Sequence, residues 1–248
     1  MQSRNIIQIH KSYSALSLYE KVSVERWQRL NPEHNYTFLV HEEADRHVYD
    51  LFPGWKKHYD SLHLGAKSNI RRAAVLHNVG GLYVDCDMCP VVPLDTYMPE
   101  NSPVILFRHN IEKFFMNGCI ASERGQEMMK AIALEGLKRT KESQAPPLSE
   151  YNKWLGWHFD TTGIHCYDQM FKKYGHKVED AVSGLHYHGH DIADGQIPAD
   201  LKAVHYGTAL WMPKNKDKSS ESMYDNQNAN LDLIYNLFGV SGRLDHKR

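Results

Sequence analysis

Residues 80–87 read Gly-Gly-Leu-Tyr-Val-Asp-Cys-Asp, and this stretch decides the fold class that we expect. A helical pattern of apolar residues covers residues 65–78 and stops at the glycine pair, which breaks helices. The apolar run 82–84 then predicts a buried strand that leads directly into Asp85 and Asp87. Because open α/β sheets bind ligands at the carboxyl ends of their strands, we expect the two carboxylates to mark a ligand site.

Short apolar runs alternate with helical patterns on both sides of this stretch, as is typical of α/β proteins. We expect strands at 6–9, 36–40, 82–84, 104–107 and 119–121, and helices at 17–30, 65–78, 126–140 and 231–238. Two short helices are expected on either side of Pro53-Gly54, and polar loops at 141–149 and 214–230. The pattern predicts a mixed, mostly parallel central sheet flanked by helices.

The composition is that of a globular protein with an ordinary core. The chain has 248 residues, 42% of them hydrophobic, and 29 basic against 30 acidic residues give a net charge of -1. This balance argues against nucleic acid as the partner. Four cysteines are too few for a disulfide framework in a chain of this length. With neither a signal-peptide pattern nor a membrane span, we expect a cytoplasmic protein, bacterial or, if viral, in the host cytoplasm.

The pair Asp85 and Asp87 predicts a metal site. Residues two apart in a regular strand point to the same face, so the two carboxylates would converge and repel each other. A divalent hard cation removes this repulsion. Mn²⁺ or Mg²⁺ held by one or two carboxylates completes its shell with waters and phosphate oxygens. A metal–diphosphate site is therefore the natural interpretation of the motif.

The surrounding residues resemble a known family. Arg72, the block Gly80-Gly81-x-Tyr83-x-Asp85-x-Asp87 and the segment Pro93-Leu94-Asp95 are similar to the DXD sugar-binding signature of glycosyltransferase family 32. That family includes the Och1-like mannosyltransferases and is related to the large clostridial glucosylating toxins. Weaker matches follow in the family's order, at residues 4–9, 27–36, 117–118, 162–163 and 205–211.

The resemblance implies a GT-A-like fold and a metal-dependent, retaining glycosyltransferase. It would move a hexose from a UDP- or GDP-sugar to a glycan, protein or other hydroxyl acceptor. The implied catalytic residues are Asp85, Asp87 and Arg72, and the implied ligands of Mn²⁺ or Mg²⁺ are Asp87, Asp85 and His205. The implied donor-binding residues are Gln8, Ile9, Asn69, Arg72, Asp85, Asn117 and Trp211. We expect one domain, residues 1–248, with a donor-binding half to about 125 and a closing, acceptor-side half from about 126.

Several positions depart from the family's pattern. Asn69 stands where the family usually has an aspartate that contacts the donor sugar. An amide both donates and accepts hydrogen bonds, so we expect binding with an altered sugar preference. The other departures are Ile7, His10, Ile164 and Ala209, the last with Thr208 beside it as a substitute for a metal-binding serine.

Two other functions are open. A zinc-binding protein would use Cys86 and Cys89, which have ligand spacing, together with the alternating histidines of 186–190. Against this, Cys86 lies between the two aspartates and is expected to be a small buried residue beneath them. A catalytically weak sugar-nucleotide-binding module is the second alternative, and Asn69 is the feature that favours it.

Overall fold

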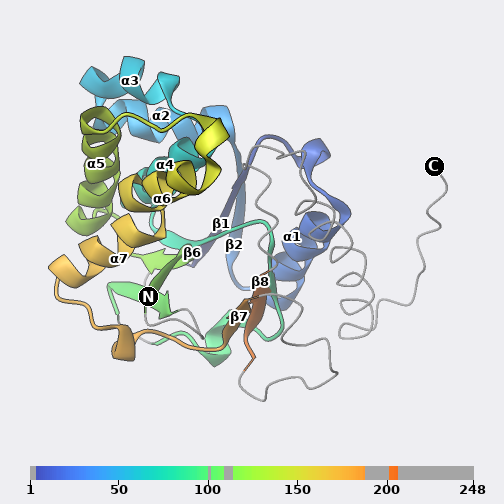
Figure 1. Cartoon of the computed structure of the whole chain (residues 1–248). Coiled ribbons are helices and arrows are strands. Elements are labelled where there is room, and N and C mark those ends of the chain that lie inside the picture. The colour runs from blue at the N-terminus through green and yellow to red at the C-terminus, as the bar shows by residue number, and fades with distance from the viewer. Residues whose placement is uncertain (1–3, 100–101, 109–113, 188–200, 206–248) are drawn as a thin grey trace.

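The computed structural model describes residues 4–99, 102–108, 114–187 and 201–205 (Figure 1). Its centre is a five-stranded sheet with the order β2-β1-β3-β6-β5. These strands are β1 Asn5–His10, β2 Asn35–Val40, β3 Gly81–Val84, β5 Val104–Arg108 and β6 Phe115–Ser122. β1 runs parallel to β2 and β3, whereas β6 is antiparallel to β3 and β5. All five strands were expected, and the mixed sheet is confirmed.

Helices cover both faces of this sheet (Figure 1). They are α1 Leu18–Leu30, α2 His41–Leu51, α3 Lys56–Ser61, α4 Leu64–Val79, α5 Glu127–Glu142, α6 Tyr151–Thr161 and α7 Ile164–Lys173. α4, α5, α6 and α7 gather on one side, and α1 lies on the other. The first five helices fall where the sequence predicts them, while α6 and α7 were not expected.

The two faces of β3 show how the core is divided. Tyr83 packs into a cluster with the apolar residues of α4, α5 and α7. Its neighbours Leu82 and Val84 point to the opposite face and pack with Trp27 of α1. This alternation is the side-chain period of a strand that is buried on both faces. The strand that leads to the aspartates is therefore held between two packed layers.

The glycine pair before β3 serves a specific geometry. Gly80 ends α4 with a φ of 71°, and Gly81 begins the strand with a φ of 119°. A Cβ atom at Gly81 would lie 2.5 Å from the carbonyl oxygen of Asn5. Positive φ and close backbone approach both favour glycine. The helix can therefore turn directly into the central strand.

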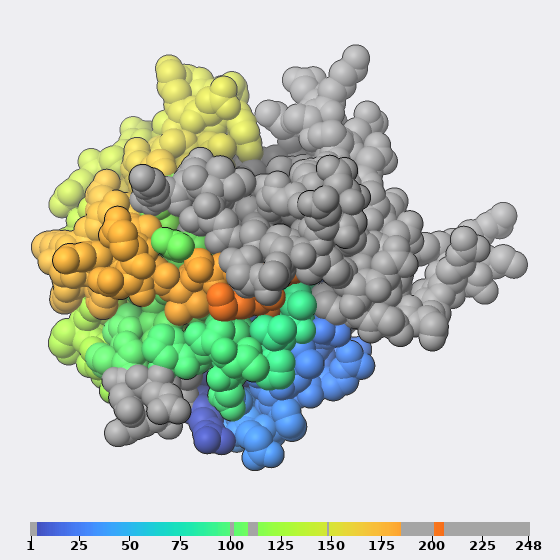
Figure 2. Space-filling model, turned by 90° about the horizontal axis from the view of Figure 1, so that it is seen from below, coloured from blue at the N-terminus to red at the C-terminus, as the bar shows by residue number. Residues whose placement is uncertain are grey.

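A second, three-stranded sheet has the order β4-β8-β7. It consists of β4 Met88–Pro90, β7 Leu185–Tyr187 and β8 Ala203–His205. α1 supports this sheet, because Ser23 Oγ and Trp27 Nε1 both donate to the carbonyl oxygen of Met88, at 2.6 and 2.8 Å. In the space-filling view, residues 201–205 (orange-red) lie beside the green segment that begins near residue 88 (Figure 2). This sheet was not expected from the sequence.

Both ends of α1 follow the sequence signals. Ser17 forms a capping box with Glu20 at the start of the helix. The helix ends before Asn31-Pro32, as expected, and Asn31 Oδ1 accepts a hydrogen bond of 2.7 Å from the backbone of Leu94. The carboxyl end of the helix thereby fixes the chain that follows β4.

Other expectations fall outside the described residues. These are the loop at 214–230, the helix at 231–238, Trp211, Thr208 and Ala209. The division into a donor-binding and a closing half stays a prediction. Within the described part of the chain, no helix has the length and apolarity needed to cross a bilayer.

Candidate functional site

Asp85, Asp87 and His205 meet at one edge of the fold. One ligand atom from each lies within 4.8 Å of the others, and among the described residues this is the one group of three or more acidic, histidine or cysteine side chains that could hold a metal ion. Asp85 follows β3, Asp87 precedes β4, and His205 ends β8. The pairing of Met88 with His205 across β4 and β8 brings the histidine to the aspartates. His205 Nε2 lies 3.1 Å from Asp87 Oδ1.

The two aspartates converge for a reason other than the one expected. β3 ends at Val84, and Asp85 to Asp87 form a turn instead of continuing the strand. The backbone N–H of Met88 donates to the carbonyl oxygen of Asp85 at 3.0 Å and closes this turn. The expectation of a common strand face was therefore wrong, although the carboxylates do come together. Cys86 between them is buried, as expected, and its Sγ lies 3.7 Å from the carbonyl oxygen of Ile9.

Arg72 of α4 is the cation beside the aspartates. Its Nη1 lies 3.3 Å from Asp85 Oδ1 and donates to the carbonyl oxygen of Asn117 at 2.6 Å. Nη2 donates to Ser68 Oγ at 3.2 Å. The guanidinium also lies over the ring of Tyr83, whose hydroxyl donates to Asp85 Oδ1 at 2.5 Å. The arginine is therefore held in one orientation by three elements of the fold.

Burial and charge act against each other at this site. Burial raises the pKa of Asp85, Arg72 opposes this rise, and Asp87 adds to it, so the net shift is upward. Burial acts to lower the pKa of His205, but the charge and hydrogen bond of Asp87 raise it above its usual value. The pKa of Arg72 is also raised, because the nearby acidic groups outweigh its burial. Two carboxylates and an imidazole this close fit a divalent cation such as Mn²⁺, which accepts oxygen and nitrogen ligands.

Gly118 of β6 allows this close approach. A Cβ atom at this position would lie 2.6 Å from Asp85 Oδ2 and 3.8 Å from the His205 ring. The backbone N–H of Asp85 donates to the carbonyl oxygen of Gly118 at 2.8 Å. In the sequence, Asn117-Gly118 is only a weak family match. The structure shows that Gly118 leaves room for the carboxylate of Asp85.

Tyr19 of α1 was also missed by sequence reasoning. Its hydroxyl lies 3.3 Å from the carbonyl oxygen of Asp87 and 3.4 Å from that of Val204. It thus connects the two segments that carry Asp87 and His205. No local signal could identify it, because its partners are 68 and 185 residues away in the sequence.

Gln8 and Ile9, which were expected to bind the donor, lie within or beside the core of the fold. Gln8 is fully buried, and its amide donates to the carbonyl oxygen of Asp85 at 3.2 Å. Its Oε1 accepts a hydrogen bond of 2.6 Å from the Tyr36 hydroxyl. Gln8 thus supports the aspartate turn from within the fold. Ile9 packs at the edge of the core, and Trp211 lies outside the described residues.

Asn69 and Asn117 lie next to each other beside Arg72. Asn117 Nδ2 donates to Asn69 Oδ1 at 3.2 Å. Asn69 is 5% exposed, and both atoms of its amide are within hydrogen-bond distance of neighbouring protein groups. The amide that replaces the family's aspartate is therefore part of a buried polar network.

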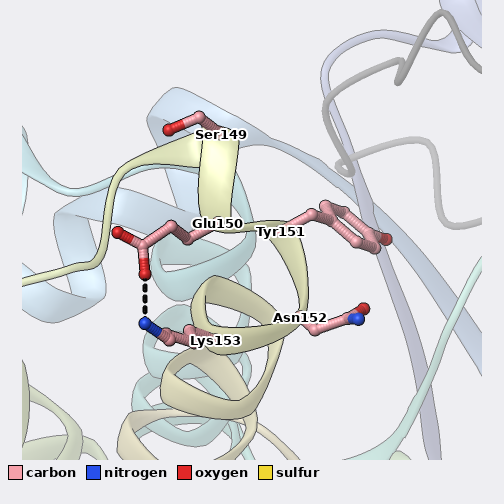
Figure 3. Close-up of a pocket in the computed structure, with 5 residues that line it drawn as sticks. All are labelled: Ser149, Glu150, Tyr151, Asn152 and Lys153. Atoms are coloured by element: carbon pink, nitrogen blue, oxygen red, sulfur yellow. Dashed lines mark ion pairs between the residues drawn. The ribbon is translucent and has the colours of Figure 1, made fainter.

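Two hollows in the surface are lined by residues outside this cluster. One of about 700 Å³ is lined by residues 149–153, where Glu150 pairs with Lys153 and Tyr151 points to another side (Figure 3). A second of about 550 Å³ is lined by His58, His63, Trp154, Trp157 and their neighbours. Neither includes an expected site residue, so the site is defined by its side-chain cluster.

The residues of the zinc alternative are also located in part. Cys86 and Cys89 are buried free thiols, and within the described residues neither belongs to a group of three or more metal-ligating side chains. His188 and His190 lie outside the described residues. The metal cluster that the described chain does contain uses carboxylates and His205.

Comparison with known proteins supports the same class. Residues 17–103 match the family described as "Glycosyltransferase sugar-binding region containing DXD motif". The matched segment contains Asn69, Arg72, Asp85 and Asp87. The resemblance to DXD-containing glycosyltransferases is thereby confirmed over this segment, and so is the enzyme class, while the narrower assignment to family 32 stays a prediction.

Solved structures show the same fold at low sequence identity. The structure described as "PaToxG Glycosyltransferase" is 16% identical, with a TM-score of 0.52, over 95% of this chain and 87% of that one. The catalytic domain of alpha-toxin from Clostridium novyi is 10% identical, with a TM-score of 0.51, over 91% and 82%. The expected GT-A-like fold is confirmed. No curated protein matches the sequence.

Proposed function

We propose that the protein is a metal-dependent, retaining glycosyltransferase that moves a hexose from a UDP- or GDP-sugar to a hydroxyl of a glycan or protein. The observation that carries this proposal is the cluster of Asp85, Asp87 and His205 beside Arg72, within the segment that matches the sugar-binding family. The four free cysteines suit the reducing cytoplasm in which we place the reaction.

The side chains divide into ligands and a fixed positive charge. Asp87, Asp85 and His205 would hold Mn²⁺ or Mg²⁺, which when bound neutralises charge on the departing nucleotide diphosphate. Arg72 adds a permanent charge next to Asp85, and its bonds to Asn117 and Ser68 remove the need to reorganise during the reaction.

For the retained configuration, we propose attack on the face that the diphosphate leaves. The acceptor oxygen forms its bond to the anomeric carbon as the bond to the diphosphate oxygen breaks. The acceptor proton passes to that departing oxygen. Asp85 is a poor candidate for a covalent nucleophile, because Tyr83 and Arg72 already engage its carboxylate. The family resemblance supports the retaining outcome.

The test is a panel of UDP- and GDP-hexoses with Mn²⁺, scored for nucleotide release with and without acceptors. Asp87→Asn is expected to lower release by about 100-fold or more, the scale of losing one transition-state stabilising group. Asp50→Asn is the matched control, since Asp50 is exposed on α2 within the same matched segment and is not part of the metal-ligand cluster. Equal activity of Asp87→Asn and wild type would overturn the proposal.

A binding module without transfer is the second candidate, and Asn69 in place of aspartate favours it. In that case calorimetry would detect Mn²⁺-dependent binding of a nucleotide-sugar, but no nucleotide would be released. Metal analysis of the purified protein addresses the zinc alternative, which predicts stoichiometric zinc.

A further inference from the structure

Asn69 lies at the centre of a chain of polar contacts that begins at His158 of α6 and ends at Asp85. Its Nδ2 lies 3.3 Å from His158 Nε2 and 3.5 Å from Thr162 Oγ1. Its Oδ1 accepts from Asn117 Nδ2. The carbonyl oxygen of Asn117 then accepts from Arg72, which pairs with Asp85.

The chemistry of these groups sets a direction for the chain. An amide NH₂ only donates, so His158 Nε2 must accept and the proton of the neutral ring must be on Nδ1. Burial, followed by His63 and Arg72, lowers the pKa of His158 to about 3, which keeps the ring neutral at physiological pH. With its NH₂ group facing His158 and Thr162, Asn69 presents its oxygen to Asn117.

The orientation of Asn117 follows from that of Asn69. Because its Nδ2 donates to Asn69, its Oδ1 is the group that remains to bind a ligand. This oxygen makes no hydrogen bond within the described residues, and the side chain is only partly buried. The carbonyl oxygen of Asn117 accepts a hydrogen bond from Arg72. The next residue, Gly118, lies against the carboxylate of Asp85. Asn117 is therefore close to both charged side chains.

We propose that Asn69, held by His158 and Thr162, is a positioning residue that orients Asn117 so that Asn117 Oδ1 accepts a hydrogen bond from a hydroxyl of the transferred sugar. This inference rests on the proposed function. The family resemblance already implies a donor contact for Asn117, and the new element is the role of Asn69, which changes from a direct sugar contact to the support of one. It also explains how an amide can occupy this position: Asn69 needs an acceptor facing Asn117 and a donor facing neutral His158.

The direction of this bond can be tested with modified donors. A hydroxyl that donates to Asn117 Oδ1 is lost equally when it is replaced by hydrogen or by fluorine, since fluorine accepts but does not donate. For wild type we expect one sugar position at which both replacements lower kcat/KM by about tenfold, the scale of one unmade hydrogen bond. In Asn117→Ala this discrimination should fall below about twofold. A donor whose fluorine analogue reacts as well as the hydroxyl at every position would overturn the proposal.

Two substitutions of Asn69 separate positioning from simple packing. Asn69→Asp keeps an acceptor for Asn117, so we expect kcat/KM for the donor within about threefold of wild type. Asn69→Ala removes the acceptor and should raise KM about tenfold, with loss of the fluorine–hydroxyl discrimination. Thermal melting of both variants reports whether the fold survives. Equal discrimination in both variants would contradict a positioning role.

A measurement independent of activity completes the test. The ¹⁵N shifts of the His158 ring should show the proton on Nδ1 in wild type and a change to protonated Nε2 in Asn69→Asp, where only acceptors face the ring. If Nε2 of the wild-type ring carried the proton, the donor and acceptor roles of Asn69 and Asn117 would be exchanged, and the proposal would be refuted. If no nucleotide-sugar is consumed, the proposed function and the sugar contact fail together, while the ring measurement still decides the orientation of Asn69.

Discussion

At the scale of single residues, Gly118 controls the distance between β6 and the aspartates. A methyl group at this position would lie 2.6 Å from Asp85 Oδ2, which is shorter than van der Waals contact. The carboxylate would have to shift from the position in which it pairs with Arg72. A displacement of this kind affects a preorganised site more than the surrounding core.

We therefore expect Gly118→Ala to lower kcat/KM by about 100-fold, while the overpacked site costs about 1–3 kcal/mol of unfolding free energy. Nucleotide release and urea unfolding measure the two effects. Gly156→Ala is the control, because a Cβ atom there meets nothing within 4 Å and alanine favours the α6 helix. Wild-type activity in Gly118→Ala would show that the carboxylate tolerates the methyl group.

At the scale of elements, α1 holds the strand that follows Asp87. The carbonyl oxygen of Met88 in β4 accepts two hydrogen bonds, from Ser23 and from Trp27. Arg26 of the same helix donates to Pro90 at the other end of β4. The position of Asp87 therefore depends on a helix that contributes no metal ligand.

Because Ser23 and Trp27 share one acceptor, their removal should be cooperative. Trp27→Phe or Ser23→Ala leaves the Met88 carbonyl oxygen with one of these two side-chain donors, and each is expected to cost about 1–2 kcal/mol of unfolding free energy. The double variant leaves a buried carbonyl without either donor, so its cost should exceed the sum by about 1 kcal/mol. A double-mutant cycle in urea measures this coupling. Strict additivity would show that the two hydrogen bonds act independently.

The elements also show which parts of the fold the sequence can predict. The helix α1, bounded by Ser17 and Asn31-Pro32, and the strand β3, preceded by two glycines, have strong local signals and were predicted nearly to the residue. The strands β4, β7 and β8 have three residues each, too few for any periodicity, and they exist because they pair with one another. α6 mixes aromatic, histidine and polar residues without a simple apolar stripe.

The candidate site shows the same division between residues with a local sequence signal and residues placed by distant pairing. Asp85, Asp87 and Arg72 lie in a motif of sixteen consecutive residues and could be recognised together. His205 was named from the resemblance, and only the pairing of β8 with β4 shows why it reaches Asp87. The contributions of Tyr19 and His158 arise from tertiary packing, which has no signature at these positions, and Gly118 was marked only as part of a weak family match.

At the scale of the whole molecule, buried histidines make stability depend on pH. His158 is 2% exposed, and burial is the main reason that its pKa falls from 6.5 to about 3. Between these two values the unfolded chain binds a proton that the folded protein does not. The free energy of unfolding therefore decreases as the pH falls through this window, and recovers as the pH rises above about 6.5.

One such histidine contributes at most about 1.4 kcal/mol per pH unit. We expect His158→Gln to unfold with a slope that is shallower by about 1 kcal/mol per pH unit between pH 4 and 6. Urea unfolding across this range measures the slope. A slope unaltered by His158→Gln would mean that the ring is already protonated in the folded state.

The metal ligands are spread along the chain in a way that links binding to global stability. Asp85 and Asp87 belong to the turn between β3 and β4, whereas His205 comes from a strand 118 residues beyond Asp87. A cation held by all three would join these segments in the folded state, and the unfolded chain cannot reproduce this arrangement. Such preferential binding stabilises the native protein by mass action.

Mn²⁺ at about 100 times its dissociation constant should add about 2.7 kcal/mol of stability, which for a chain of this size raises Tm by about 5–10 °C. Scanning fluorimetry with Mn²⁺, and then with excess chelator, measures the rise and its reversal. Asp50→Asn should behave like wild type, because Asp50 is exposed on α2 and is not part of the cluster, while Asp87→Asn and His205→Ala should lose most of the rise. If Mn²⁺ raised the Tm of all three variants by the same amount, it would be acting elsewhere on the protein, and the cluster of Asp85, Asp87 and His205 would not be its site.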